Sequence, residues 1–188
     1  MANTFTASFD VNVTLNEIVG SGGLRSGSIP TRFLQQLQMA TGTADGQVNV
    51  GYYKRESGIG ASVTTSYDLV GGLTDASGNA INIDEVVLIA IRNLSATAAN
   101  YLVMAPNATN GFGIVSSNKG FWAAAGGSGG GSVIPADYDS ATDTGSWVVL
   151  HSRVGIPAAA GSTDILSVIT QSATSSNTWD IVIIGRDN

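Results

Sequence analysis

The residue types that catalysis needs are scarce in this chain. His151 is the only histidine, and it ends the apolar segment WVVLH, where we expect an ordinary strand residue. A Ser-His-Asp hydrolase needs its histidine beside a nucleophile, and no serine is set in the strand-to-helix elbow that presents one. Glu17, Glu56 and Glu85 are the only glutamates, although spacing does not exclude a carboxylate pair formed in space. We expect no enzymatic activity and no catalytic residues.

Metal and cofactor sites are also not expected. The segment DYDSATDTG carries Asp137, Asp139 and Asp143, but Ala141 and Thr142 stand where a calcium-binding loop needs an oxygen ligand and a glycine. A solvated acidic loop is the favoured interpretation. The chain contains no cysteine, so thiolate ligands are excluded.

The glycine tract and the tryptophans suggest two further kinds of binding site, a phosphate-binding loop and a carbohydrate platform. Gly126–Gly131 lacks the Gly-Lys-Ser/Thr ending of a phosphate-binding loop, and we expect an exposed loop there. Trp122, Trp147 and Trp179 suit a carbohydrate platform, but Trp147 and Trp179 flank apolar strands. Packing in a core or an interface is therefore favoured over sugar binding.

Composition indicates an all-β protein. Charged residues make up 12% of the chain, about half the usual share, so long amphipathic helices lack residues for their solvated side. The formal charge of −6 opposes binding to nucleic acid, which needs cationic side chains to neutralise phosphates. No apolar run approaches the ~20 residues of a membrane helix, and MANTFTASFD does not resemble a signal peptide. We expect a protein that is made in the cytoplasm and binds neither membrane nor nucleic acid.

The chain is expected to divide into an arm and one sandwich domain. Phe9, Val11 and Val13 alternate with polar residues, which indicates a half-buried strand. The glycine-rich segment Gly20–Ser28 follows and reads as a flexible connection. Thr31–Ala40 fits a helix or a strand, and its neighbours favour a strand. We therefore expect a flexible N-terminal arm in residues 1–28 and an antiparallel β-sandwich or jelly roll in residues 29–188.

The segment Ile81–Ser95 is the strongest strand signal. It becomes uninterruptedly apolar from Val86 to Ile91, so both faces of the strand need to be covered. Asn100–Pro106 is expected to be its hairpin partner, and Ile181–Ile184 is again apolar on both faces. Because a two-layer sandwich covers only inner faces, either the chain's own loops or a partner chain must cover the outer ones, and we favour a partner. The candidate interface residues are Phe9, Val11, Val13, Val86, Leu88, Ile89, Ile91, Ile181, Ile183 and Trp122.

Several segments, taken in order, resemble a family of small β-rich virion structural proteins of tailed bacteriophages. The segments are Gly42–Gln47, Tyr67–Leu69, Leu73–Asn79, Thr163–Leu166 and Trp179–Gly185, and the resemblance runs roughly from Met39 to Gly185. It is weakest over Asn107–Gly145. The chain departs from the family pattern at Ala105-Pro106-Asn107, where relatives have a turn like Val-Gly-Gly.

The resemblance implies a non-enzymatic role on the virion. The expected protein is a decoration, or cement, protein on the head surface, synthesised in the host cytoplasm and needing no cofactor. Its expected partners are the major capsid protein and copies of itself in a homotrimer. The alternatives are another virion component, such as a head fibre, portal-vertex or tail-associated protein, or a carbohydrate- or host-binding module.

Overall fold

The computed structural model describes residues 7–19, 27–75, 77–95, 100–106, 109–112, 132–134, 146–171 and 176–188, and within these ranges the chain forms strands, turns and loops with no helix. The all-β prediction is confirmed. The strands are β1 (Ala7–Val19), β2 (Gly27–Thr41), β3 (Gln47–Val48), β4 (Val50–Ile59), β5 (Thr64–Asp68), β6 (Val70–Thr74), β7 (Ala80–Asn82), β8 (Glu85–Asn93), β9 (Tyr101–Pro106), β10 (Ser132–Ile134), β11 (Ser146–Pro157), β12 (Ile165–Gln171) and β13 (Asn177–Arg186).

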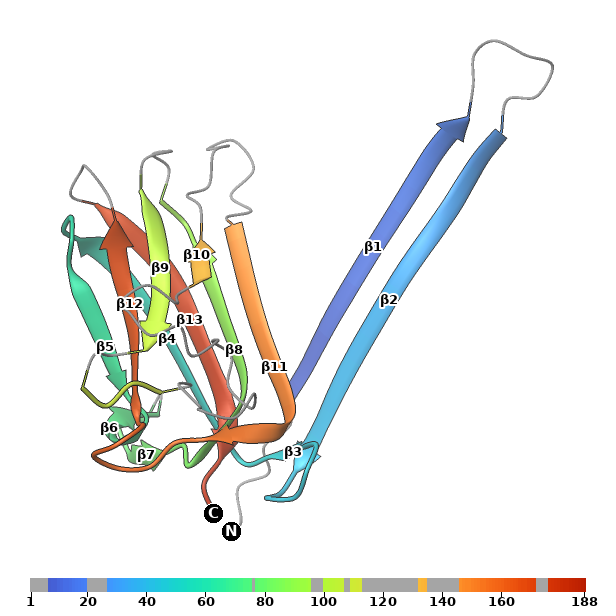
Figure 1. Ribbon diagram of the computed structural model, residues 1–188. Coiled ribbons are helices and arrows are strands. Elements are labelled where there is room, and N and C mark those ends of the chain that lie inside the picture. The colour runs from blue at the N-terminus through green and yellow to red at the C-terminus, as the bar shows by residue number, and fades with distance from the viewer. Residues whose placement is uncertain are drawn as a thin grey trace.

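Two four-stranded antiparallel sheets form the body of the protein. Their strand orders are β11-β8-β13-β4 and β10-β9-β12-β5, and they stack as two layers (Figure 1). Their pairings are nested, because β4 pairs with β13, β5 with β12, β8 with β11, and β9 with β10. A long antiparallel ribbon of four nested pairs, rolled up so that successive strands mostly change sheet, is a jelly roll. The sandwich expected from sequence is therefore confirmed.

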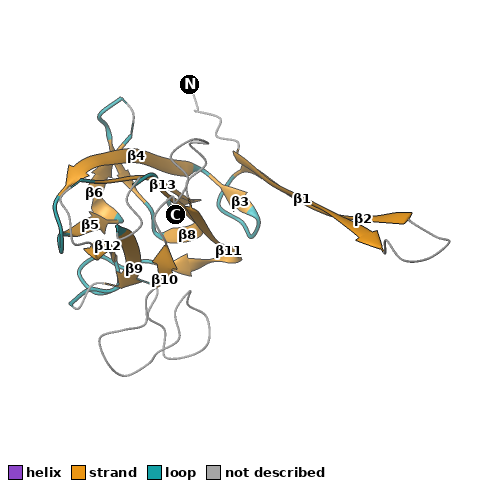
Figure 2. Ribbon diagram, turned by 90° about the horizontal axis from the view of Figure 1, so that it is seen from above, coloured by secondary structure: helices purple, strands orange, loops and turns teal. Residues whose placement is uncertain are grey.

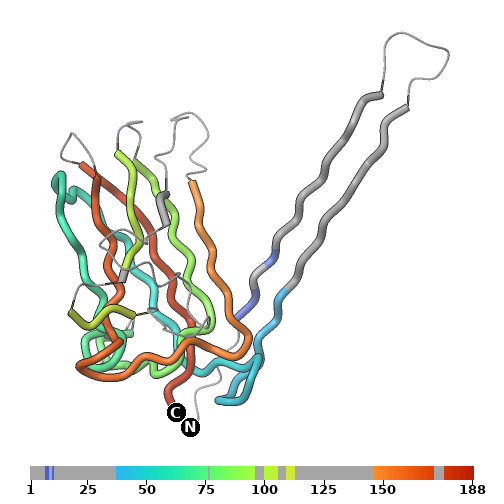
Figure 3. The backbone as a smooth tube through the Cα atoms, viewed as in Figure 1, coloured from blue at the N-terminus to red at the C-terminus, as the bar shows by residue number. Residues whose placement is uncertain are grey.

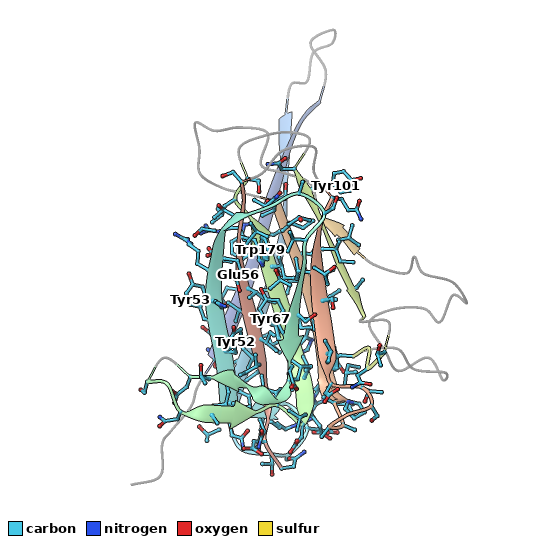
Figure 4. All side chains as sticks on the ribbon, turned by 90° about the vertical axis from the view of Figure 1, so that its left-hand side faces the viewer. Tyr52, Tyr53, Glu56, Tyr67, Tyr101 and Trp179 are labelled. Carbon is cyan, nitrogen blue, oxygen red and sulfur yellow. The ribbon has the colours of Figure 1, made fainter. Side chains whose placement is uncertain are left out.

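The core lies between the two sheets. Alternate residues of β8 and β13 point inward, and Ile89, Ile91, Trp179, Ile181 and Ile183 are fully buried there. Trp179 Nε1 donates a hydrogen bond to Tyr67 Oη at 3.1 Å, and Figure 4 shows Tyr52, Tyr67 and Trp179 together between the layers. Burial raises the pKa of Tyr67 well above its ordinary value. The polar atoms of this aromatic group are thus satisfied inside the core.

One expected pairing is wrong. The segment Asn100–Pro106 was expected to form a hairpin with the central strand, but β9 pairs with β12 and β10 in the opposite sheet. The neighbours of β8 are instead β11 and β13, which are distant in sequence. The tube in Figure 3 shows the red β13 running between β8 and β4. Strand pairing therefore follows the nested order of the jelly roll and not closeness in the sequence.

The first two strands form a long hairpin that stands apart from the sandwich. β1 and β2 have 13 and 15 residues and pair from Ala7↔Met39 to Val19↔Gly27. We call this hairpin the ribbon. It leaves from the side of the β11-β8-β13-β4 sheet and diverges from it (Figures 1 and 2). Within the described chain its other pairing is a short parallel bridge from Ala40 and Thr41 to β3.

Both strands of the ribbon confirm predictions made from the sequence. Phe9–Leu15 was expected to be a strand, and Thr31–Ala40 was favoured as one, and both are strands. The arm expected within residues 1–28 is a projecting hairpin that also takes in β2. The glycine-rich connection lies largely outside the described residues.

Candidate interaction surface

The face of the β11-β8-β13-β4 sheet that points away from the core is the candidate functional surface, here called the outer face. The strand register sets its side chains in rows across the four strands. The first row is Trp147, Arg92, Asp180 and Arg55; the second is Val149, Ala90, Val182 and Tyr53; the third is His151, Leu88, Ile184 and Gly51. A charged and aromatic row therefore borders two mainly apolar rows.

Asp180 is the centre of the first row. Its Oδ1 accepts hydrogen bonds from Arg55 Nε at 2.7 Å and Tyr53 Oη at 3.2 Å. Its Oδ2 accepts from Arg55 Nη2 at 2.9 Å and Arg92 Nη2 at 2.7 Å. These donors, led by the Arg55 guanidinium, lower the pKa of Asp180 to about 2. The carboxylate is thus ionised and fixed in position, in what we call the clamp.

Large aromatic side chains stand at both sides of the clamp. Trp147 on β11 is 55% exposed and lies with its ring centroid 5.3 Å from Arg92 Cζ, a cation–π contact. Tyr53 on β4 is 61% exposed although its hydroxyl is bonded to Asp180, and Figure 4 shows it at the margin of the sandwich. Trp, Tyr and Arg are the residue types that dominate the binding energy of protein interfaces. The part of the outer face around the clamp, which we call its upper part, therefore has the composition of a binding surface.

The lower part of the outer face is covered by the chain itself. Val87, Leu88 and Ala90 of β8 form a second hydrophobic cluster with Met39 and Val48. The partly buried side chains packed against this cluster are Ala7, Leu37, Val149, Val182 and Ile184. Ala7, Leu37 and Met39 belong to the base of the ribbon. The ribbon base and β3 thus seal this end of the sheet.

A β-bulge explains how β8 supplies both clusters. Ile184 pairs with Leu88 but Gly185 pairs with Val86, so Val87 is an extra residue in the ladder. Val86 consequently packs in the core, whereas the next two residues, Val87 and Leu88, both join the outer cluster. The two-sided burial expected of this strand is confirmed, because every residue from Val86 to Ile91 is buried.

Arg186 joins the foot of the ribbon to the sandwich. Its side chain is 1% exposed, and its Nε lies 2.7 Å from Glu85 Oε2. Its Nη1 donates to Ala44 O at 2.6 Å, in the loop that follows β2, and its Nη2 donates to Val154 O. Gly155, with φ +85°, leaves room for the guanidinium that a Cβ would fill. One buried cation therefore ties together β8, β11 and the loop at the ribbon foot.

The register gives the ribbon one face rich in apolar residues. Phe9 is paired with Leu37, and Val13 with Phe33. Directly opposed residues of an antiparallel pair share a face, so the odd-numbered apolar positions of β1 and β2 belong together. Leu37 and Met39, at the base of this same face, are the residues that pack on the sandwich. The apolar face thus continues beyond the part that the sandwich covers.

The candidate interface residues fall into four groups. Val86, Ile89, Ile91, Ile181 and Ile183 lie in the core between the sheets. A partner chain could reach them only by opening the sandwich, so their placement at an outer interface is corrected. Leu88 does face outward, but the ribbon base covers it. Phe9, Val11 and Val13 lie in β1, and Trp122 lies outside the described residues.

The residues considered for chemistry are dispersed. His151 is an exposed residue of β11 whose pKa is lowered by partial burial. Glu56 pairs with Lys54 Nζ at 2.8 Å, and Glu85 pairs with Arg186. Trp179 is a core residue, whereas Trp147 is on the outer face. Gly126–Gly131, Asp137, Asp139 and Asp143 lie outside the described residues.

Sequence reasoning missed the clamp. Arg55, Arg92 and Asp180 stand in three different segments, and only the pairing of β4, β13 and β8 brings them into one row. One signal was available: in QVNVGYYKRE, Tyr53 and Arg55 occupy the positions that alternate with the apolar Val50 and Tyr52. That alternation predicts an outward-facing aromatic and cation on the same strand.

The chain was compared with known protein families, curated proteins and solved structures. No protein-family model, no curated protein and no solved structure matches the chain. In the described residues no group of three or more His, Cys, Asp or Glu side chains is placed to hold a metal ion. Nor do those ranges contain a helix with the length and apolar character of a membrane span.

Proposed function

We propose that this chain is a non-enzymatic structural protein of a tailed-phage virion that decorates the head. It binds the major capsid protein and copies of itself, assembling as a homotrimer. The resemblance of Gly42–Gln47 and the segments that follow it to phage virion proteins suggests the setting. A jelly roll with a projecting β-ribbon and an aromatic, arginine-bearing face supports a role in binding other proteins.

The ribbon is the observation that carries this proposal. The two sheets of the jelly roll are complete without it, so it is not needed to close the core. An isolated two-stranded hairpin is only marginally stable in water, and ordering each residue costs about 1–2 kcal/mol of conformational entropy. Two strands of 13 and 15 residues therefore need a surface to lie on. A protein that works by assembly provides one.

The polar groups described in the sandwich support a structural role. The clamp uses Asp180 to bridge two arginines, and Arg186 joins three segments of backbone. Each of these charges holds strands in place. The buried tyrosine of the core, Tyr67, accepts a hydrogen bond from Trp179. These contacts between strands support a structural role.

Copy number in the virion tests the proposal. Particles of the phage that encodes the chain would be purified, and the chain would be quantified against the major capsid protein by gel densitometry. A decoration protein is expected at a fixed ratio close to the capsid protein, and stripped particles should rebind added full-length chain to the same ratio. Absence from the particles, or only a few tens of copies, would contradict head decoration; the second result would indicate a portal-vertex, fibre or tail component.

A further inference from the structure

Around the clamp the outer face carries exposed aromatic side chains, and the described part of the ribbon does not extend over them. The ribbon covers Leu88 and Ala90 at its base and then diverges from the sheet (Figure 1). Above that point Trp147 and Tyr53 are more than half exposed. Val149 and Val182 share a row with Tyr53 and are partly buried, because they pack against the cluster at the ribbon base. This area is flat, partly apolar and rigidly backed by the sheet.

Within one chain, the outer face already binds the base of the ribbon. Ala7, Leu37 and Met39 are the first residues of the apolar face of the ribbon, and they pack on this sheet within one molecule. Further along, the same face of the ribbon carries Phe9, Val11 and Val13 by register. The surface and the element that suits it therefore continue from an existing contact, and beyond that contact the backbone of the ribbon diverges from the sheet (Figure 1).

We infer that the ribbon of one copy lies across the upper outer face of a second copy. This inference rests on the self-assembly part of the proposed function and assigns the two surfaces that perform it. Each copy supplies one ribbon and receives one, so the contact joins two different surfaces, and it closes either as a two-fold dimer that exchanges ribbons or as a head-to-tail ring. A homotrimer is one such ring.

The size of the contact suits a stable assembly. A 13-residue strand is about 44 Å long at ~3.4 Å per residue, and two strands are about 10 Å wide. One ribbon face therefore covers roughly 400 Å². In a reciprocal dimer each partner gives and receives a ribbon, so about 800 Å² is buried on each, which is the area of a standard protein interface. In a ring each pair of neighbours shares one ribbon contact, of about 400 Å² per partner, and every copy makes two such contacts.

The charges of the two surfaces are complementary. The clamp has two arginines for one aspartate and so carries one net positive charge. On the apolar face of the ribbon the register places one charged residue, Glu17, which gives that face one negative charge. Opposite net charge favours this pairing in a chain whose total charge of −6 otherwise opposes self-association.

The first test places a carboxylate on either face of the ribbon. Val11→Asp puts the charge on the apolar face, and the control Asn12→Asp puts it on the opposite face one residue away. Molar mass would be measured by light scattering over a range of concentrations, against a monomer of 19.1 kDa. Val11→Asp should give monomer where the native chain and Asn12→Asp give oligomer. An intact near-ultraviolet dichroism signal from buried Trp179 verifies that the sandwich stays folded.

The second test alters the receiving surface. Trp147→Asp removes an exposed aromatic from the outer face, and the control Tyr101→Asp removes one that is 40% exposed on β9 of the other sheet. Trp147→Asp should be monomeric and Tyr101→Asp should assemble normally.

Mixing the two defective variants then identifies the contact. Val11→Asp keeps a functional outer face, and Trp147→Asp keeps a functional ribbon. Together they should form a 1:1 pair, although each is a monomer alone. Ribbon-to-ribbon pairing would leave Trp147→Asp oligomeric, face-to-face pairing would leave Val11→Asp oligomeric, and either result would overturn the inference while self-assembly stands. A native chain that is monomeric at every concentration would overturn both, and capsid binding is measured separately.

Discussion

The sandwich and the ribbon are built from the same kind of strand but are stabilised differently. β8 and β13 are covered on their inner faces by the opposite sheet and bury nearly every side chain. β1 and β2 pair over their full length, and among their described side chains those at the base, Ala7, Leu37 and Met39, pack on the sandwich. β8 and β13 each pair with a neighbour on both edges, whereas β1 and β2 form one full ladder, with each other. The sandwich strands are therefore held by two ladders and by burial together, whereas the ribbon has one ladder and little described burial, so we expect the ribbon to be the less stable region in a single chain.

The largest expected effect is in the core. Trp179→Ala removes a fully buried side chain and leaves the hydroxyl of Tyr67 without its donor. We expect a loss of about 4 kcal/mol in the free energy of unfolding, the usual cost of emptying such a site. Urea denaturation of the monomer would measure it. Trp147→Ala is the matched control on the outer face and should cost less than about 1 kcal/mol; equal losses would show that the two faces are equally buried.

The junction between the regions should be almost as sensitive as the core. Arg186→Met leaves Glu85 and the carbonyls of Ala44 and Val154 without their buried partner. Removing one member of a buried ion pair costs about 3 kcal/mol, again read from urea denaturation. Arg55→Met, which removes a half-exposed arginine from the clamp, should cost about 1 kcal/mol or less. A reversed order would contradict the role given to Arg186.

The clamp should give a smaller effect that depends on pH. The pKa of Asp180 is about 2 in the folded chain, below the ordinary value of 3.8. Because the folded pKa is depressed, the clamp stabilises the fold above about pH 4, and this stability is lost as pH falls towards 2. Asp180→Asn should therefore cost about 1 kcal/mol at pH 5, after allowing for solvent screening of Arg55, and almost nothing at pH 2. A difference that is constant from pH 5 to 2 would rule the clamp out.

The ribbon should give the smallest effect on the single chain. Val13→Ala removes apolar surface from a strand that does not reach the core, so the free energy of unfolding of the monomer should change by less than about 0.5 kcal/mol. Val182→Ala, a valine of the outer cluster, is the comparison and should cost about 1–2 kcal/mol. A similar loss at Val13 in the monomer would show that the ribbon is held by its own chain.

Much of the fold follows from sequence patterns, because strand alternation reflects local burial. Phe9–Leu15 and the two-sided Val86–Ile91 are strands as expected. Pairing is harder, since nested closure of a jelly roll sends β9 to the opposite sheet from β8. Assigning faces also failed, because the bulge at Val87 breaks the alternation and no sequence pattern reveals it. The clamp depends on residues from three strands, so it could be recognised only once their register was known.

Hydrogen exchange along the chain tests the central claim most directly. Backbone amides of β1 and β2 would be compared with those of β8 and β13, in dilute monomer and in the concentrated assembly. Ribbon amides in the monomer should exchange at least 100-fold faster than those of β8 and β13, because little free energy opposes opening of an uncovered hairpin. On assembly they should slow by at least tenfold, while the sandwich amides barely change. Ribbon amides that are as protected as β8 in dilute monomer would contradict the claim that the ribbon depends on a partner.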